Sequence, residues 1–438
     1  MRSHHLDITH SLWRKTAPNR APCPPLSGTS SADIVIIGGG FTGLNAALQS
    51  ALKGYDVALL EAHEVGWGAS GRNGGQVNPA LPIATPEALF SAFKAPFAER
   101  FAHLSLNSAD YLFDLIKTHQ IDCDARQTGW IRAHHNEAAK NKAISSAQKW
   151  GEYGAQMSLL GSSETSALTG THRYDSALLT QAGGLVHPLK LARGLADTAI
   201  RNGARLYENS PLHALKKLAQ GWQIITDKGA ITARLIIFAT NAYAGLNARK
   251  SAPEQRPLTR AIIPVCPIQI ATDPLDDALA DSILPYGHSI SDSRRMIIYA
   301  RREPCNRIIY GSIGKRGIDG RLAGFAWLRR DALKTFPQLR GVDWPYQWGG
   351  QIALTDNKLP RLATVADGII AGFGYNGRGV AMAHVMGQIL ADYATGTAEA
   401  DLPLPLMPPK PYSGRFIQTM GLNSYIEFAK ICDWLESM

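Results

Sequence analysis

The sequence predicts a mixed α/β protein of two domains, one built on a parallel sheet and one on a mostly antiparallel sheet. Three observations lead to this prediction. The 438 residues of the chain exceed what one small hydrophobic core usually holds. Residues 33–37 form an apolar, β-branched run that is followed by a glycine-rich helix start and a second short strand. Residues 258–345 instead alternate strand-like runs with proline, glycine and charged turns.

The first of these stretches carries a nucleotide-binding pattern. Gly38, Gly40 and Gly43 stand in G-x-G-x-x-G spacing between strand and helix. In this pattern the glycines allow a tight turn, a close approach to a pyrophosphate and close helix packing, and the helix N-terminus binds the phosphates. Glu61 ends the second strand, where an acid accepts hydrogen bonds from ribose hydroxyls. The stretch predicts an adenine dinucleotide site and leaves FAD and NAD open; a glycine-rich turn of another α/β unit is the less favoured alternative.

The remaining segments follow from local patterns. Residues 1–30 are polar and proline-bearing, which predicts an extended arm that Trp13 anchors to the body. Residues 66–82 are so rich in glycine that we expect them to pass close to a ligand or another backbone. Helical spacings occur in 86–122, 136–168, 189–201 and 380–395, and strand-like runs in 127–132, 223–226, 235–240, 262–265, 296–300, 308–310 and 369–372.

These elements predict a discontinuous arrangement of domains, because α/β material stands at both ends of the chain. We assign an N-terminal arm to 1–30 and a nucleotide-binding domain to 31–90, 170–257 and 346–405. A substrate domain takes 91–169 and 258–345, and a C-terminal tail or helix takes 406–438.

Composition limits the classes of function. An apolar content of 45% and a charged content of 18% are typical of an ordinary globular protein. The net charge is +9, but Lys and Arg are spread along the chain, whereas nucleic-acid-binding proteins concentrate them in one stripe. We therefore expect no nucleic-acid partner and a preference for small anionic ligands.

The cysteines indicate a reducing compartment. Cys23, Cys123, Cys266, Cys305 and Cys432 are odd in number and include no C-x-x-C pair, which argues against a disulfide framework and a zinc site. No cluster of His and Cys suggests any other metal. The N-terminus has no apolar signal-peptide core and no 18 apolar residues run together, so we expect a cytoplasmic protein without a membrane span.

Several motifs together resemble one family. VIIGGGFTGLNAA, VGWGASGRNGGQ, GGLVHPLKLARGLA, ATNAY, LPRLA and GFGYNGRGVAMAHVMGQILADYATG follow one another over roughly residues 11–400. In this combination they resemble the FAD-dependent amine oxidoreductases of the D-amino-acid oxidase and sarcosine oxidase family. The GASGRNGGQ loop and the GYNGRGVA run are most similar to the γ-glutamylputrescine oxidoreductase branch.

The resemblance implies a glutathione-reductase-like, Rossmann-type FAD-binding domain and a set of cofactor contacts. The glycine-rich turn at 374–379 would face the flavin edge that becomes negative on reduction, and a helix N-terminus stabilises an anion by about 0.3–1 kcal/mol. Ser210 and Pro211 would flank the adenine. The residues implied to bind FAD are Gly38, Gly40, Phe41, Thr42, Gly43, Glu61, Ala69, Ser70, Arg72, Asn73, Gly74, Gly75, Gln76, Leu212, Thr240, Asn241, Gly374, Tyr375, Asn376, Gly377, Arg378, Gly379 and Val380.

The sequence departs from the family pattern at two places. Gly349 and Gly350 stand where several members attach flavin through a cysteine, so the resemblance implies non-covalent FAD. Ile309 stands where sarcosine oxidases carry a lysine that helps to activate oxygen, and Lys315 in the following turn is a poor substitute. The electron acceptor is therefore left open between O2 and another acceptor such as a quinone.

Candidate catalytic groups come from the strands expected to face the flavin and from the flavin-edge turn. We select Tyr310, Arg302 and Tyr375, with Arg301 and Tyr299 as further candidates, because an arginine can hold a substrate carboxylate in a bidentate manner. A sheet or surface role is the alternative for each strand residue. Arg72 is predicted either to face the flavin or to form a surface ion pair. His384 and His187 are expected to be a packed helical residue and a turn or helix-start residue.

The implied reaction is the oxidation of an amine by hydride transfer from the carbon that bears nitrogen to flavin N5, which gives an imine that water hydrolyses to an aldehyde. The substrate most favoured by the resemblance is γ-glutamylputrescine or a similar ω-amine, in polyamine catabolism. Two alternatives remain: an oxidase or dehydrogenase of N-methyl or D-amino acids, and a flavin-binding protein without turnover. The sequence leaves open the substrate pocket, the acceptor and the oligomeric state.

Overall fold

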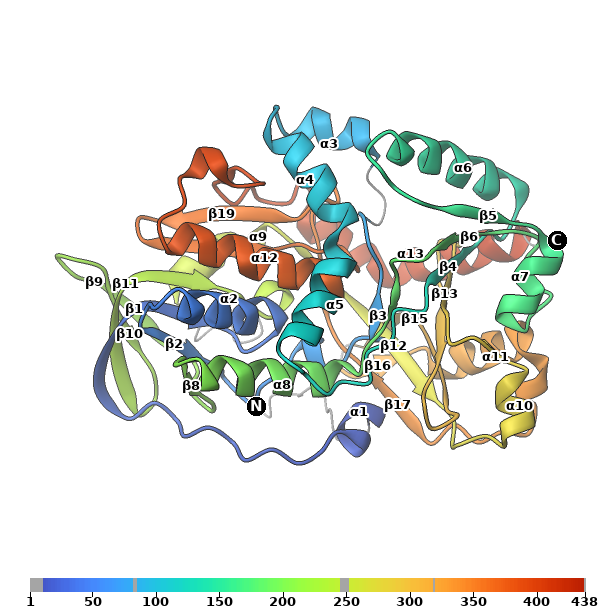
Figure 1. Cartoon of the computed structure of the whole chain (residues 1–438), viewed down its shortest axis with the longest axis horizontal. Helices are drawn as coiled ribbons and strands as arrows, with labels where there is room; N and C mark the ends of the chain where they lie inside the picture. Colours follow the sequence, from blue (N-terminus) through green and yellow to red (C-terminus); the bar gives the residue numbers. More distant parts are fainter. Residues whose placement is uncertain (1–10, 82–84, 245–251, 318–319, 437–438) are drawn as a thin grey trace.

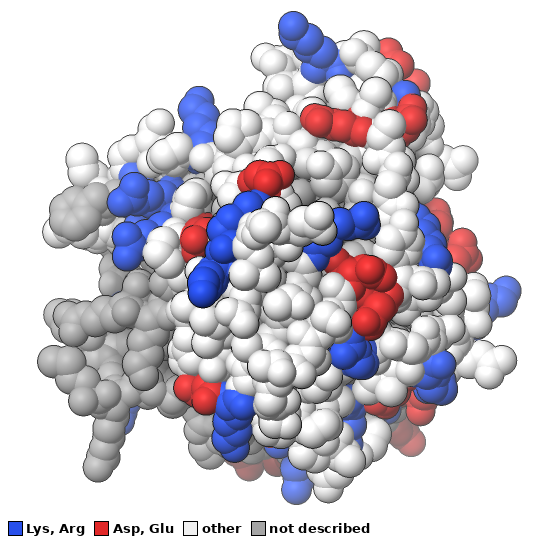
Figure 2. Space-filling model, turned by 90° about the vertical axis from the view of Figure 1, so that its left-hand side faces the viewer, with Lys and Arg blue, Asp and Glu red and all other residues white. Residues whose placement is uncertain are grey.

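The structure is a computed structural model that describes residues 11–81, 85–244, 252–317 and 320–436. Two sheets lie side by side, with helices α2, α8 and α12 against the first and α11 and α13 against the second (Figure 1). No helix in these ranges is both long and apolar enough to cross a bilayer. On the face drawn in Figure 2, acidic and basic side chains are interspersed, in keeping with their spread along the sequence.

The first sheet has a core of parallel strands, and helices pack on it because its strands are apolar on both faces. Its order is β21-β19-β20-β11-β1-β2-β8, in which β8, β2, β1, β11 and β20 are parallel to one another. The strand β10 pairs antiparallel with β11, and β9 pairs antiparallel with β10. The strands are β1 (Gly28–Ile37), β2 (Val57–Leu60), β8 (Arg205–Tyr207), β9 (Ala214–Lys217), β10 (Trp222–Ile225), β11 (Gly229–Phe238), β19 (Arg361–Ala366), β20 (Ile369–Phe373) and β21 (Leu406–Met407).

Successive residues of β1 face two different cores, which explains its unbroken apolar run. Ile34 and Ile36 pack towards the helices, whereas Val35 and Ile37 belong to a second cluster on the other face. The helices on the first face are α2 (Phe41–Leu52), α5 (Ser108–Thr118), α8 (Pro188–Arg201) and α12 (Gly379–Ala394). The packing of α12 against α2 brings the N-termini of two helices from distant parts of the chain to the same edge of the sheet.

The second sheet is antiparallel except for the pair β13–β4, and its order is β17-β12-β15-β14-β13-β4-β6-β5. Its outer face carries Ile308, Tyr310 and Ile270 in a core with α11, and its inner face turns towards the first domain. The elements are β4 (Trp130–Ala133), β5 (Ser158–Leu160), β6 (Ala177–Thr180), β12 (Ile263–Ala271), β13 (Ser289–Asp292), β14 (Tyr299–Arg302), β15 (Ile308–Arg316), β17 (Tyr346–Gly349), α11 (Phe325–Thr335) and α13 (Arg415–Leu435).

Smaller elements complete the fold. A two-stranded sheet of β3 and β7 joins the glycine-rich loop to the segment before α8. These elements are α1 (Leu12–Thr16), β3 (Gln76–Val77), α3 (Pro86–Ala92), α4 (Phe97–Leu106), α6 (Glu137–Gly151), α7 (Ser162–Thr169), β7 (Gly184–Leu185), α9 (Arg256–Arg260), α10 (Asp277–Asp281), β16 (Leu322–Ala323) and β18 (Ile352–Leu354).

The predicted fold class is confirmed, but several boundaries are different. The arm, of which residues 1–10 lie outside the described ranges, contains the helix α1 and the start of β1 rather than extended chain alone. Trp13 is fully buried, and its Nε1 donates to the carbonyl of Asn73 at 2.8 Å. The strand β6 pairs with β4 in the second sheet, and β21 pairs with β19 in the first, so both lie across the boundaries drawn from the sequence.

Candidate functional site

A long cavity opens at the carboxyl ends of β1, β2 and β11. Its lining reaches from the end of β2 to the turn before α12, so the cavity suits an elongated ligand. The predicted residues that line it are Gly38, Gly40, Phe41, Thr42, Glu61, Ala69, Ser70, Asn73, Leu212, Thr240, Asn241, Tyr375, Asn376, Gly377, Gly379 and Val380, together with Ser210 and Pro211.

The glycine motif forms one end of the cavity, and its glycines lie too close to neighbouring atoms to carry a side chain. Gly38 has a φ of +116°, and a Cβ on Gly43 would lie 2.0 Å from the carbonyl oxygen of Gly38. A Cβ on Gly40 would lie 2.8 Å from the Ser70 hydroxyl, which accepts the amide of Phe41 at 2.9 Å. The start of α2 therefore presents bare backbone to the cavity, as a phosphate group requires.

Glu61 lies at the end of β2 beside this turn. Its carboxylate accepts the amide of Gly39 at 2.6 Å and the amide of His63 at 2.9 Å. Burial raises the pKa of Glu61, the two amides lower it, and nearby Glu208 raises it further. The carboxylate is thus oriented by two backbone donors and still lines the cavity, which is the arrangement that a ribose hydroxyl needs.

The opposite wall joins the end of β11 to the turn after β20. Asn241 has a φ of +44°, and its side-chain oxygen accepts the amide of Gly374 at 3.0 Å. The hydroxyl of Thr240 lines the cavity and is buried without a hydrogen-bond partner in the described part of the chain. A buried polar atom without a partner is unusual in a protein interior, so a ligand atom at this position fits the structure.

The turn before α12 is held in place by polar contacts to the segment after β18 and to the start of α2. The side-chain oxygen of Asn376 accepts the amide of Thr355 at 2.9 Å, and the Tyr375 hydroxyl lies 2.6 Å from the hydroxyl of Thr42. Burial raises the pKa of Tyr375. The contact between Tyr375 and Thr42 fixes the N-termini of α12 and α2 on one cavity, which suits a ligand with negative charge at two positions along its length.

Other predicted contacts lie outside the cavity lining: Gly43, Arg72, Gly74, Gly75, Gln76, Gly374 and Arg378. Arg72 is buried, so the alternative of a surface ion pair is wrong for it. Its side chain is 1% exposed, lies over the ring of Trp67 and donates to the carbonyl of Trp67 at 2.6 Å. Arg72 therefore stabilises the conformation of the glycine-rich loop, because its guanidinium donates to a backbone carbonyl of the same loop.

The same loop docks on the inner face of the antiparallel sheet, which explains its two further glycines. A Cβ on Gly74 would lie 2.9 Å from the ring of Tyr299, and one on Gly75 would lie 2.1 Å from the guanidinium of Arg301. The side-chain Nε2 of Gln76 donates to two backbone carbonyls of the sheet, at 3.1 and 3.0 Å. These residues join the two domains beside the cavity rather than lining it.

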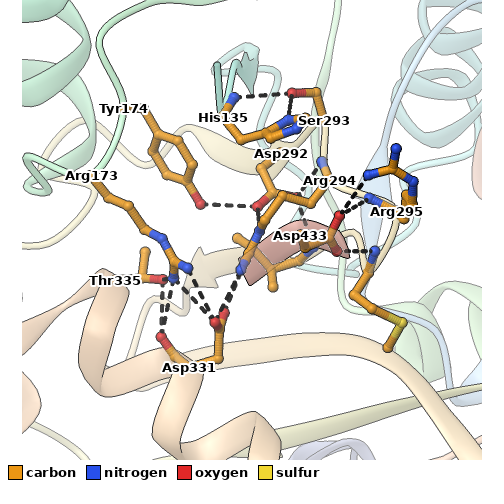
Figure 3. Close-up of polar contacts among 12 residues, drawn as sticks. His135, Arg173, Tyr174, Asp292, Ser293, Arg294, Arg295, Asp331, Thr335 and Asp433 are labelled. Carbon is orange, nitrogen blue, oxygen red and sulfur yellow. Dashed lines mark hydrogen bonds and ion pairs between the residues drawn. The ribbon is translucent and has the colours of Figure 1, made fainter. Parts of the chain in front are cut away.

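Two of the three candidate catalytic residues, Tyr310 and Arg302, do not line the cavity. Tyr310 points to the outer face of its strand, where its hydroxyl donates to Asp331 at 2.7 Å. Asp331 belongs to a buried network with Arg173 and Arg294 (Figure 3). Arg302 forms an ion pair with Asp281 at 2.6 Å. Of the three candidates only Tyr375 lines the cavity.

Among the lining residues that were not predicted from the sequence, four have aromatic or polar side chains: His63, Trp67, Tyr243 and Gln255. The ring of Trp67 stacks on His63 with centroids 4.0 Å apart and meets Tyr243 edge-on at 5.8 Å. Trp67 stands inside the glycine-rich loop and Tyr243 inside the ATNAY motif, so a large aromatic residue in a ligand-binding motif was an available signal. Gln255 also lines the cavity, and nothing in its local sequence indicates this.

Comparison with known proteins agrees with this geometry. The model of the family described as "FAD dependent oxidoreductase" matches residues 33–393. The chain belongs to this family of FAD-dependent oxidoreductases and is an enzyme homologous to amine and amino-acid oxidases. The cavity provides what FAD requires: two helix N-termini, an oriented acid and an unsatisfied hydroxyl.

Three individual proteins are similar to the chain in sequence or in fold. The chain is 34% identical over 414 residues to the gamma-glutamylputrescine oxidoreductase of Escherichia coli (strain K12), with 93% of each chain covered. It is 31% identical to a probable oxidoreductase, OrdL, of Haemophilus influenzae, with 94% of each covered. Among solved structures, the glycine oxidase of Geobacillus kaustophilus shares the fold with a TM-score of 0.68 at 20% identity, covering 85% of this chain and 96% of that one.

Proposed function

We propose that the protein oxidises γ-glutamylputrescine or a similar ω-amine to an imine, which water hydrolyses to the aldehyde. The observation that supports this proposal is the 34% identity, over 93% of both chains, to a gamma-glutamylputrescine oxidoreductase. An identity of this level along the whole chain includes both the cofactor domain and the antiparallel sheet. Oxidation of N-methyl or D-amino acids is the alternative that the substrate panel below separates from it.

FAD would be held by the residues that line the cavity, and it would supply the acceptor, at flavin N5, for the hydride that leaves the carbon bearing nitrogen. The start of α2 and the hydroxyl of Thr240 suit the phosphates. Glu61 suits the ribose, and the turn at 375–379 suits the flavin ring. The remaining task of the protein is to hold the amine in its neutral form against this ring.

That task has a definite energetic cost. A primary amine with a pKa of about 10.4 requires roughly 4–5 kcal/mol for deprotonation at pH 7, and only the neutral form donates hydride. Desolvation disfavours the ammonium form, so apolar walls lower this cost. The inner face of the antiparallel sheet carries buried aromatic side chains that support such a setting: Trp348 is 2% exposed, and burial raises the pKa of Tyr299.

We propose further that FAD is bound non-covalently and that O2 is a slow acceptor. Within the described ranges no cysteine lines the cavity. A Cβ on Gly350 would already lie 3.3 Å from Arg72, which leaves little room for an attached side chain. Ile309 is buried beside Trp13 and Trp348. Lys315 pairs with Glu427 of α13 at 2.7 Å, so it is held away from the inner face of its sheet.

Anaerobic mixing of the holoenzyme with candidate amines tests the proposed reaction. Bleaching of the flavin band near about 450 nm by γ-glutamylputrescine is expected. Bleaching only by N-methyl or D-amino acids would favour the alternative, and no bleaching by any amine would contradict enzymatic amine oxidation. Acid precipitation should release the yellow colour into the supernatant, and stopped-flow reoxidation should be faster with a soluble quinone than with O2.

A further inference from the structure

Two arginines approach each other beside the flavin-edge turn. Arg378 immediately precedes α12, and its neighbours Gly377 and Gly379 line the cavity. Its guanidinium lies 4.3 Å above the ring of Trp130 and donates to the carbonyl of Pro79 at 2.5 Å. Arg132 stands two residues after Trp130 on β4 and therefore on the same inner face of the sheet.

The alternation of side chains along β4 places Trp130 and Arg132 on the face of the sheet that is turned towards the first domain. Ile131 and Ala133, which alternate with Trp130 and Arg132 along the strand, pack in the core on the outer face of the sheet. The indole of Trp130 donates to the hydroxyl of Ser291 at 2.9 Å, which fixes the ring under Arg378. Both arginines are half-buried as whole residues, and burial lowers the pKa of each guanidinium.

The pair lacks the counter-charge that other deep arginines have. Arg294 pairs with Asp292 and Asp331, and Arg301 pairs with Glu303. Within the ranges that the structure describes, Arg132 and Arg378 each lack a carboxylate at ion-pair distance, and the charge of Asp292 reaches Arg132 only from the outer face. Burial and the charge of Arg132 lower the pKa of Arg378 to about 9, and burial lowers that of Arg132.

We propose that Arg132 and Arg378 bind the carboxylate at the far end of the amine substrate. This inference rests on the proposed function and specifies the substrate class: an ω-amine that carries a carboxylate remote from the oxidised carbon. Buried positive charge without a partner is costly, and a carboxylate would neutralise it. Arginine matches the planar carboxylate with paired N–H donors, and the ring of Trp130 holds one guanidinium in orientation.

The test compares γ-glutamylputrescine, N-glutarylputrescine, which lacks only the α-amino group, and N-butanoylputrescine, which keeps the amide and the reacting amine but lacks the carboxylate as well. The proteins are the holoenzyme and its variants Arg132→Gln and Arg378→Gln. Arg302→Gln serves as the control, because its guanidinium pairs with Asp281 outside the cavity. Anaerobic stopped-flow gives the substrate dissociation constant and the limiting rate of flavin reduction, and flavin content and melting temperature verify folding.

We expect each variant to raise the dissociation constants of γ-glutamylputrescine and N-glutarylputrescine roughly 10- to 100-fold, as for a lost charged hydrogen bond, with little change in the limiting rate. Binding of N-butanoylputrescine should stay unchanged, and wild-type enzyme should bind it more weakly than N-glutarylputrescine. Equal losses for all three amines would overturn the proposal in favour of a structural role. Sulfite binding to the flavin is measured in the same variants. If the variants bind sulfite more weakly but keep the wild-type preference among the amines, the arginines act on the cofactor and the proposal is overturned.

A second readout separates this inference from the proposed function. Calorimetric titration of the oxidised holoenzyme with glutarate, which is not oxidised, should show binding that both variants lose and Arg302→Gln retains. If no amine reduces the flavin, the proposed reaction fails and this titration still decides the role of the pair. Undetectable glutarate binding to wild-type enzyme, together with no preference for the carboxylate-bearing amine, would overturn the inference.

Discussion

The carboxylate of Glu61 accepts the backbone amide of Gly39 at 2.6 Å and so ties the end of β2 to the glycine turn after β1. The same carboxylate accepts the amide of His63, so one side chain orients two backbone segments of the cavity. A glutamine at position 61 offers only one acceptor oxygen and places its amide group against the other donor. The acid therefore shapes the site in addition to providing a ribose contact.

Glu61→Gln should weaken FAD binding about tenfold, the cost of one unmade hydrogen bond to a charged group. Titration of apoprotein with FAD, followed by flavin fluorescence, measures the dissociation constant. Glu64→Gln is the matched control, because Glu64 lies in the same segment but is exposed and pairs with Arg14. Equal effects of the two substitutions would show that general loss of negative charge, and not the position of Glu61, matters.

Gly43→Ala should reduce FAD affinity and stability together. The added methyl group would lie 2.0 Å from the carbonyl of Gly38, so α2 must move away from the turn, at a cost of about 1–3 kcal/mol. Melting temperature with and without FAD measures both effects. Gly151→Ala, at the end of α6 with no atom within 4 Å, should be neutral or stabilising by up to about 1 kcal/mol. A harmless Gly43→Ala would contradict the close packing described.

Tyr310→Phe should destabilise the protein without slowing flavin reduction. The hydroxyl donates to Asp331 and lies 2.8 Å from the hydroxyl of Thr335, so its removal takes one donor from a buried carboxylate that keeps its arginine partners, at a cost of about 0.5–1.5 kcal/mol. Urea unfolding and anaerobic reduction rates measure the two properties. Tyr286→Phe, at a tyrosine that is 64% exposed, is the control for stability. A large fall in the reduction rate alone would restore Tyr310 as a catalytic candidate.

Stability should fall as the pH decreases from 6.5, in part because of His187. Its Nδ1 accepts the amide of Lys190 as the cap of α8, and burial lowers its pKa to about 3. Because the pKa in the folded state is below that of the unfolded chain, the unfolded state takes up the proton first. The resulting loss approaches about 1.4 kcal/mol per pH unit between 6.5 and 3.

His187→Asn keeps a capping side chain and removes the titrating group. The difference in unfolding free energy between pH 7 and pH 4.5 should therefore be smaller in this variant than in wild type, as measured by urea unfolding. His172→Asn, at an exposed histidine, should retain the wild-type pH dependence. An unchanged difference in His187→Asn would assign the acid sensitivity to other groups, among which buried His384 has a pKa lowered to about 4.

The sequence predicted the nucleotide-binding unit well because its signals are local. The strand, the glycines, the helix and Glu61 stand next to one another, and each has a steric or hydrogen-bonding reason for its position. The strand begins earlier than predicted, at Gly28, because residues 28–32 pair with β11 about two hundred positions later. Such pairing leaves no trace in the local pattern of polar and apolar residues.

The direction in which the Tyr310 side chain points could not be predicted, for a related reason. Alternation along β15 places Ile309 and Tyr310 on opposite faces, and either face is compatible with the sequence. The choice is made by α11, which covers the Tyr310 side, and by Trp13 and Trp348, which cover the Ile309 side. A residue pair such as Arg132 and Arg378 is likewise invisible in the sequence, because it arises only when β4 meets the turn before α12.

The cavity takes its walls from β1, from the end of β11 and from α12, which begins only at Gly379. During synthesis on a ribosome, a nascent chain therefore has the glycine motif long before it has a closed site. FAD can be captured tightly only after nearly the whole polypeptide has emerged, and a truncated product that ends before α12 should be colourless even if its first strands fold. Cofactor content consequently reports on completion of the chain, since a ligand that binds only the finished fold also stabilises it.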